Sequence, residues 1–138
     1  MALLDDLLAR MRAAPELNDI QVLENESVDD ETFVFKVRAA IVSCFLQIRF
    51  LADRDLRRYS FQLYSDRSLL RWDNTPHYPG LLNFPHHFHD QDENISSSTL
   101  TGDLLNDYDL IIADVLDYVA GKIWSYSLIV TGLIVPVL

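Results

Sequence analysis

Apolar residues at the start of the chain recur at the spacing of an α-helix. Five of them fall three and four positions apart: Leu3, Leu4, Leu7, Leu8 and Met11. This pattern places apolar side chains on one face of a helix. Pro15 follows at once, and proline cannot continue a helix. We therefore predict a first helix over residues 1–14.

Residues 20–73 show a different pattern, in which apolar and polar side chains alternate. A period of two is typical of strands that bury one face. Short polar clusters separate the apolar runs, which favours antiparallel pairing between neighbours. The runs are residues 20–23, 32–41, 44–51, 59–64 and 69–73. The pattern predicts an antiparallel sheet of about five strands.

Alternation also divides this sheet into two faces, because successive side chains point to opposite sides of a strand. One face collects apolar residues: Phe33, Phe35, Val37, Leu46, Ile48, Phe50, Tyr59, Phe61, Leu63, Leu70 and Trp72. The other collects mainly polar and basic residues: Lys36, Arg38, Arg49, Arg58, Gln62, Tyr64 and Arg71. The second face is either an ordinary solvated surface or a surface that binds anions.

Three segments complete the chain. Residues 74–99 hold three prolines and all four histidines, and we predict a histidine-rich irregular loop. Residues 101–122 carry apolar positions at helical spacing, which predicts a second, long helix. Residues 123–138 are uncharged and too short for the roughly 20 apolar residues of a membrane span. We expect a buried strand or a contact tail there, including a homodimer contact, and no membrane association.

Together these elements predict a single α+β domain over residues 1–138. The sheet packs its apolar face against the N-terminal helix and the long C-terminal helix. A single cysteine, Cys44, excludes an internal disulfide framework and a cysteine-based zinc site. Asp5 and Asp6 interrupt the first apolar run, so residues 1–14 do not resemble a signal peptide. We expect a cytoplasmic protein.

Charge is unevenly distributed along the chain. The formal net charge is -10, which disfavours non-specific binding to nucleic acids. Residues 36–71, however, hold eight basic residues and three acids, a local charge of +5, whereas the remainder carries -15. The predicted sheet is therefore locally basic within an acidic protein.

The clustered histidines allow three interpretations. Neutral imidazole accepts a proton near pH 7 and imidazolium returns it, so two histidines beside arginines suit acid–base cleavage of RNA. The same side chains, with a carboxylate, also supply ligands for a divalent metal. Alternatively, the histidines order the loop by packing and hydrogen bonding. The residues concerned are His77, His86, His87, His89, Asp73 and Arg71.

Two motifs in this region resemble those of the TumE-type toxins of toxin–antitoxin modules. The first is Arg71-Trp72-Asp73-Asn74-Thr75-Pro76-His77, and the second is Phe84-Pro85-His86-His87-Phe88-His89. The resemblance extends in layout over residues 34–119. It implies a toxin that is neutralised by a helix-turn-helix antitoxin encoded nearby, and a ribonuclease-like attack on RNA. Two positions depart from the family pattern: Tyr78 stands where many members have histidine, and Phe88 where lysine is usual.

The resulting hypothesis is a toxin that cleaves RNA by histidine acid–base catalysis, without a metal or other cofactor. Its candidate catalytic residues are His77, His86, His87, His89, Asp73 and Arg71. Its candidate substrate-binding residues are Lys36, Arg38, Arg49, Arg58, Tyr64, Trp72 and Asn74. The alternatives are a non-catalytic interaction module and a metal-dependent hydrolase.

Overall fold

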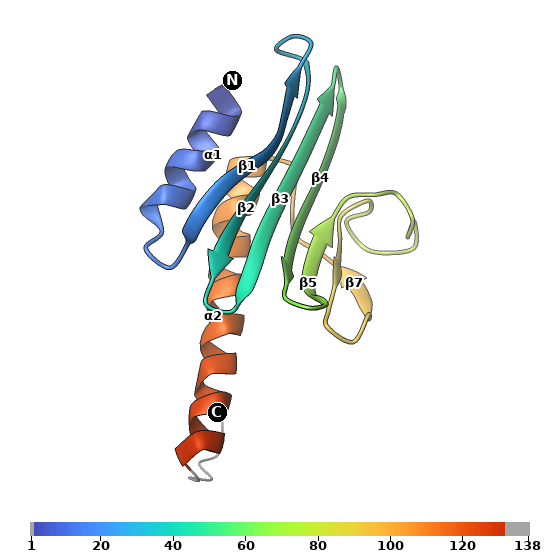
Figure 1. Ribbon diagram of the computed structural model, residues 1–138. Helices are drawn as coiled ribbons and strands as arrows, with labels where there is room; N and C mark the ends of the chain where they lie inside the picture. The colour runs from blue at the N-terminus through green and yellow to red at the C-terminus, as the bar shows by residue number, and fades with distance from the viewer. Residues whose placement is uncertain (1, 132–138) are drawn as a thin grey trace.

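The computed structural model describes the backbone of residues 2–131 and the side chains of residues 2–121. Within that part, a helix, seven strands and a second helix follow one another (Figure 1). The helices are α1 (Ala2–Ala13) and α2 (Leu104–Thr131). The strands are β1 (Asn18–Ser27), β2 (Thr32–Ile41), β3 (Cys44–Asp53), β4 (Leu56–Tyr64), β5 (Ser68–Asp73), β6 (His87–His89) and β7 (Ile95–Ser97). The predicted α+β class is confirmed.

The strands form one antiparallel sheet in which each strand pairs with its neighbours in sequence, in the order β1 to β7. We expected about five strands, so the predicted number is too low. The additional strands β6 and β7 lie inside residues 74–99, which we expected to be irregular. Each has only three residues, too few to produce a recognisable alternation.

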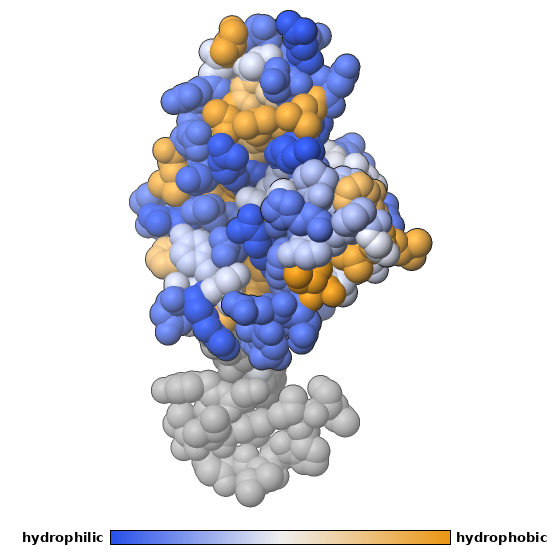
Figure 2. Space-filling model, turned by 90° about the vertical axis from the view of Figure 1, so that its right-hand side faces the viewer, coloured by the Kyte–Doolittle hydropathy of each residue, from blue (hydrophilic) through white to orange (hydrophobic). Residues whose placement is uncertain are grey.

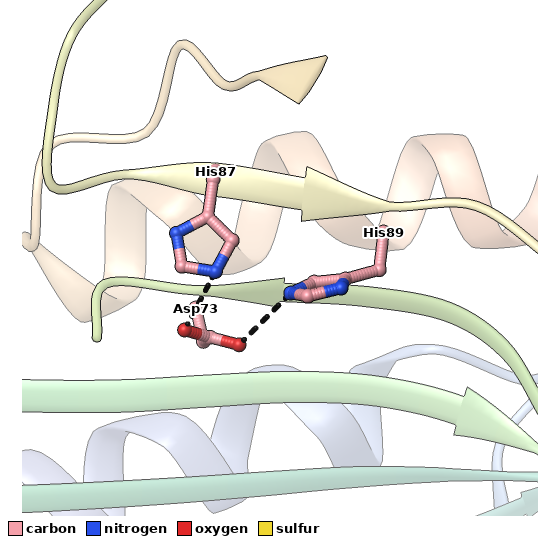
Figure 3. A group of neighbouring side chains, drawn as sticks. All are labelled: Asp73, His87 and His89. Atoms are coloured by element: carbon pink, nitrogen blue, oxygen red, sulfur yellow. Dashed lines mark ion pairs between the residues drawn. The ribbon is translucent and has the colours of Figure 1, made fainter. Parts of the chain in front are cut away.

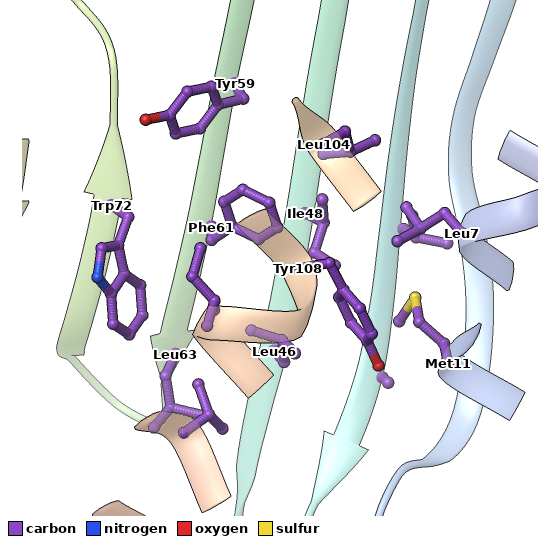
Figure 4. Packing of buried hydrophobic residues seen from close by; sticks show 14 of the residues in the cluster. Leu7, Met11, Leu46, Ile48, Tyr59, Phe61, Leu63, Trp72, Leu104 and Tyr108 are labelled. Atoms are coloured by element: carbon purple, nitrogen blue, oxygen red, sulfur yellow. The ribbon is translucent and has the colours of Figure 1, made fainter. Parts of the chain in front are cut away.

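Both helices cover the same face of the sheet, and the core lies between these layers (Figure 4). The predicted apolar face of the sheet is confirmed, since Phe35, Ile48 and Phe61 are fully buried there. They meet Leu7 of α1 and Tyr108 of α2, among others. Burial of this apolar surface is the main favourable contribution to folding.

An ion pair also joins the two helices. The Arg10 guanidinium of α1 contacts the Asp109 carboxylate of α2 and donates a second hydrogen bond to the Leu105 carbonyl oxygen, at 3.5 Å. Both side chains are exposed, so this ion pair adds little to the stability that the buried apolar contacts between the layers provide.

The second helix starts and ends later than residues 101–122. Asp103 caps its start, because its carboxylate accepts a hydrogen bond from the Asn106 backbone N–H at 3.3 Å. Gly121 does not end the helix, which continues to Thr131 and projects beyond the sheet (Figure 1). The expectation of a buried strand over residues 123–138 is therefore wrong as far as Thr131, while the alternative of a contact tail stays a prediction.

The remainder of that segment, and the side chains expected to form a homodimer contact, lie outside the described residues. Over its described residues, neither helix combines the length and apolar character needed to cross a membrane. On the side of the molecule that carries the loop and β7, most side chains are hydrophilic and apolar groups form small separate patches (Figure 2).

The face of the sheet opposite the helices carries two neighbouring rows of polar side chains that run across the strands. Register places one residue of each strand from β1 to β6 in each row, because paired residues of adjacent strands share a face. We define the Asp73 row as Glu24, Lys36, Arg49, Ser60, Asp73 and His87. We define the Arg71 row as Gln21, Arg38, Gln47, Gln62, Arg71 and His89. The sheet thereby links the basic strands to the histidines.

Phe61 lies at the centre of this core and has no solvent exposure. Replacing it as Phe61→Ala is expected to lower the free energy of unfolding by about 3–5 kcal/mol, because a buried aromatic ring is lost and a cavity remains. Urea denaturation measures the change. Leu82→Ala serves as the control, since Leu82 is largely exposed, and should cost less than about 0.5 kcal/mol. Equal losses in the two variants would contradict this assignment of the core.

Candidate active site

The centre of the site is the carboxylate of Asp73, the last residue of β5. Asp73 is only 4% exposed, although it lies on the polar face of the sheet. Its oxygens lie 2.9 Å from Arg71 Nε and 3.0 Å from His87 Nε2. They also accept the Thr75 backbone N–H at 2.9 Å and lie 3.5 Å from His89 Nε2. One buried carboxylate thus gathers an arginine and two histidines (Figure 3).

Strand register explains why these side chains meet. In the β5–β6 ladder, Asp73 lies opposite His87, and Arg71 lies opposite His89. Alternation sends the intervening residues to the other face, where Trp72 and Phe88 pack with ring centroids 5.0 Å apart. The sequences Arg-Trp-Asp and His-Phe-His therefore place polar groups on one face and aromatic groups on the other. Phe88 belongs to the helix-covered face.

His87 is held at both ring nitrogens and is 2% exposed. Its Nδ1 donates a hydrogen bond to the Pro85 carbonyl oxygen at 2.9 Å, and its Nε2 faces Asp73. Because the Pro85 carbonyl is an acceptor only, Nδ1 carries a proton. His87 is thus positioned beside Asp73 and is closed to a substrate in solvent.

His89 is oriented differently and remains accessible. Its Nε2 is buried against Asp73, and its other nitrogen points away from the carboxylate (Figure 3). The side chain is 25% exposed. With Arg71 and Tyr78 it lines a pocket of about 740 Å³, whose further walls include Arg67 and the turn after β6. His89 is therefore the histidine of the cluster that a ligand in this pocket can reach.

Asp73 and His89 differ in their charge state at neutral pH, because their surroundings shift their pKa values. Burial acts to raise the pKa of Asp73, but the hydrogen bonds from Arg71 and Thr75 and the charge of His87 outweigh it and lower the pKa. Burial lowers the pKa of His89 below its usual 6.5, despite the opposing charge of Asp73. At neutral pH, Asp73 is therefore ionised and His89 is neutral.

Tyr78 closes the site from the loop between β5 and β6. Its ring meets His87 and His89 edge-on, with centroids 4.8 and 6.1 Å away. The His77 ring also meets Tyr78 edge-on, with centroids 6.2 Å apart, and His77 is exposed. We did not predict Tyr78 as a site residue. The available signal was its position directly after His77, the last residue of the first motif.

His86 does not join this cluster. Its Nδ1 lies 2.7 Å from the Tyr59 hydroxyl, and the two rings stack with centroids 5.8 Å apart. Tyr59 belongs to the helix-covered face, so His86 turns away from His87 and His89. Burial, opposed in part by the charge of Asp107, lowers the pKa of His86. The expectation that all four histidines converge is wrong at this residue.

Two of the candidate substrate-binding residues, Trp72 and Asn74, stabilise the fold instead of facing a ligand. Trp72 is buried in the core against Phe88. The side chain of Asn74 accepts the Tyr59 backbone N–H at 3.0 Å and donates to the Arg57 carbonyl oxygen at 2.9 Å. These two bonds prolong the contact between β5 and β4 beyond the last paired residues. Neither side chain is presented to a ligand on the polar face.

The remaining candidates lie on the polar face as predicted. Arg49 pairs with Glu24 at 3.6 Å, and Arg38 lies over the Phe45 ring at 5.0 Å. Lys36 and Arg49 share the Asp73 row, and Arg38 shares the Arg71 row. Neighbouring strands lie about 4.8 Å apart, so Lys36 is roughly 14 Å from Asp73 along its row.

Arg58 and Tyr64 flank these two rows on β4. Arg58 donates to the Arg57 carbonyl oxygen at 3.3 Å, and the Tyr64 ring packs on Phe45 with centroids 5.6 Å apart. The basic side chains therefore approach the Asp73 cluster along the sheet without being part of it.

Comparison with known proteins gives one match. The family model described as toxin TumE matches residues 4–123, which is most of the chain and includes both motifs and the whole Asp73 cluster. No curated protein and no solved structure matches significantly. On the strength of this match, the chain belongs to the TumE toxin family.

Proposed function

We propose that this toxin cleaves RNA at the Asp73 cluster by acid–base catalysis. The observation that carries the proposal is the Asp73–His89 pair. A buried carboxylate faces one nitrogen of the ring, and the other nitrogen is free on the side of a pocket that Arg71 also lines. In hydrolases, a carboxylate hydrogen-bonded to one imidazole nitrogen activates the other nitrogen as a base. Here the Asp73 oxygen lies 3.5 Å from His89 Nε2 and acts on it through its charge. Membership of a toxin family implies a cognate antitoxin, which we propose to be of the helix-turn-helix type.

His89 acts as the general base in this mechanism. Asp73 favours the tautomer with the proton on Nε2, which leaves a lone pair on Nδ1. Nδ1 takes the proton of a ribose 2′-hydroxyl, and the resulting oxygen attacks the adjacent phosphorus. The bond from phosphorus to the 5′-oxygen breaks as that oxygen accepts a proton. The products are a 2′,3′-cyclic phosphate and a 5′-hydroxyl end.

We assign the proton donor to His77. It is exposed, and it contacts the same Tyr78 ring as His89. His87 is unsuited to this role, because protein atoms occupy both of its nitrogens. His77 in its protonated form supplies the proton that the 5′-oxygen needs, and His89 holds the proton taken from the 2′-hydroxyl. The two histidines then exchange protons with water to complete the cycle.

Arg71 supplies the positive charge beside the reacting phosphate. Its Nε is bound to Asp73, while its side chain is 38% exposed and lines the pocket. Guanidinium groups stabilise the charge that develops on phosphate oxygens in the transition state. The pocket lining also includes Asp90, Asp92 and Glu93, whose negative charges disfavour a phosphate beside them. The phosphate is therefore expected on the Arg71 side.

The basic residues of the two rows extend this surface away from the reacting group. Arg49 lies on β3, two strands from β5, and Lys36 and Arg38 lie on β2, one strand further away. An RNA strand that crosses the sheet places successive phosphates near these cations, which accounts for binding by a protein whose net charge is negative.

The first test compares two histidines on opposite faces of the sheet. His89→Ala is expected to abolish growth arrest on induced expression and to lower RNA cleavage by the purified chain about 10²–10⁴-fold, the usual contribution of a general base. His86→Ala removes an imidazole of the same motif from the other face, and it should retain cleavage. Circular dichroism verifies folding of both variants.

Growth arrest that persists in a folded His89→Ala variant, with unchanged RNA, would refute the catalytic assignment. It would favour the non-catalytic interaction module. Mapping of RNA ends provides the second readout, since the mechanism requires cyclic phosphate and 5′-hydroxyl termini.

The pH dependence of cleavage tests the base directly. Burial lowers the pKa of His89 below 6.5, and only its neutral form accepts a proton. The value of kcat/KM should therefore rise with pH through a pKa below 6.5, and it should fall again at higher pH because the mechanism also needs a protonated donor. Steady-state rates on a short RNA between about pH 4.5 and 8 measure this limb. An acid limb centred above pH 6.5 is the result that the assignment does not allow.

The proposed RNA-binding role of the basic residues in the two rows is tested by measuring KM and kcat separately. Lys36→Ala and Arg38→Ala should each raise KM by up to about 5-fold, equivalent to ~1 kcal/mol, with kcat nearly unchanged. The effect should diminish as salt is added. Arg12→Ala, an exposed cation on α1, is the matched control and should leave KM unchanged. A fall in kcat in the row variants, without a change in KM, would contradict a binding role.

A further inference from the structure

Three buried donor atoms converge at Asp73, His87 and His89. One carboxylate oxygen and one nitrogen from each ring all lie within 4.8 Å of one another. Asp73 and His87 are nearly inaccessible, and His89 is partly exposed toward the pocket. Two imidazoles and one carboxylate form a common ligand set for divalent transition metals, with further positions open to water.

The second nitrogen of His87 supports this view of the cluster. Nδ1 donates its proton to the Pro85 carbonyl oxygen, which leaves the Nε2 lone pair directed at the Asp73 carboxylate. Histidines that bind metals commonly donate their other N–H to a backbone carbonyl in this way. A lone pair 3.0 Å from a carboxylate oxygen needs a cation between them, either a proton or a metal ion.

The buried nitrogen of His89 is an independent observation. Its Nε2 has no solvent exposure and no hydrogen-bond partner among the described residues, and the Asp73 oxygen is 3.5 Å away. A buried polar atom without a partner is unusual, because its desolvation is not compensated. This atom points into the space between the other two donors (Figure 3).

We infer that Asp73, His87 and His89 bind one divalent transition-metal ion, with Zn²⁺ as the best match. Zinc lies about 2.0–2.2 Å from nitrogen and oxygen ligands, so two of its ligands are at most about 4.4 Å apart. The two contacts with Asp73, at 3.0 and 3.5 Å, satisfy that limit through its two oxygens, and the three donor atoms all lie within 4.8 Å of one another. Arg71 holds the carboxylate from the other side, as partners of metal ligands do.

Metal binding has a consequence for catalysis that rests on the proposed function. The ion binds the lone pair of His89 Nε2, so the single ring proton of the neutral imidazole moves, by exchange with water, from Nε2 to Nδ1. Nδ1, the nitrogen that must be free to act as a base, is then protonated. The metal-bound toxin is therefore inactive, and the metal-free toxin is active.

Binding is tested first, without RNA. Titration of the purified full-length chain with Zn²⁺ in a calorimeter is expected to show one saturable site per chain, and Co²⁺ should give visible absorption bands. His89→Ala should weaken Zn²⁺ binding by at least about 10-fold. His86→Ala and His77→Ala, which remove histidines outside the ligand set, should bind as the unaltered chain does. Asp73→Asn removes a charged ligand with little change in shape, and gives a second variant if His89→Ala does not fold.

The results separate the metal site from the proposed function. Cleavage by protein treated with EDTA, together with inhibition by Zn²⁺ that is lost in His89→Ala, supports both. Cleavage without any saturable Zn²⁺ binding, or binding that is equal in all variants, overturns the metal site and leaves the function standing. A chelated protein that is inactive until Zn²⁺ is added upholds the binding site, and overturns both the metal-free mechanism and the inhibitory role.

Discussion

The burial of one negative charge, the carboxylate of Asp73, is the constraint on which the site depends. A buried carboxylate is stable only when donors compensate its lost hydration. Arg71, Thr75 and His87 supply that compensation from the same strand, the following turn and the adjacent strand. The same need draws the ring of His89 toward the carboxylate. The site therefore forms when β5 and β6 pair. The orientation of the partly exposed His89 ring follows from that pairing.

The antiparallel ladder converts two short motifs into this arrangement. Because β5 and β6 pair residue by residue, Asp73 meets His87 and Arg71 meets His89, while Trp72 and Phe88 close the opposite face. The same alternation across β2 to β5 aligns the basic residues of the two rows with the site. An acidic chain can therefore present a locally basic surface, because strands β2 to β5 carry six basic residues and only two acids.

The sequence predicted the parts of the structure that have strong periodicity. Alternation over residues 32–73 assigned both faces of β2 to β5, and helical spacing located α1 and most of α2. The three-residue strands β6 and β7 could not be recognised by alternation. His86 was placed wrongly although a signal existed, because it is out of phase with His87 and His89 and must face the other way in an extended segment. The partners of Asp73 depend on pairing across a long loop, which local patterns do not encode.

The account depends on how protons are arranged on His89. Asp73 is assigned to hold Nε2–H, and burial to keep the ring neutral, so that Nδ1 is available to a substrate. Nitrogen-15 NMR of the imidazoles in the metal-free chain measures both properties in a single pH titration. The account predicts that His89 has the Nε2–H tautomer and a pKa below 6.5. A proton on Nδ1 in the neutral ring, or a pKa above 6.5, would contradict it.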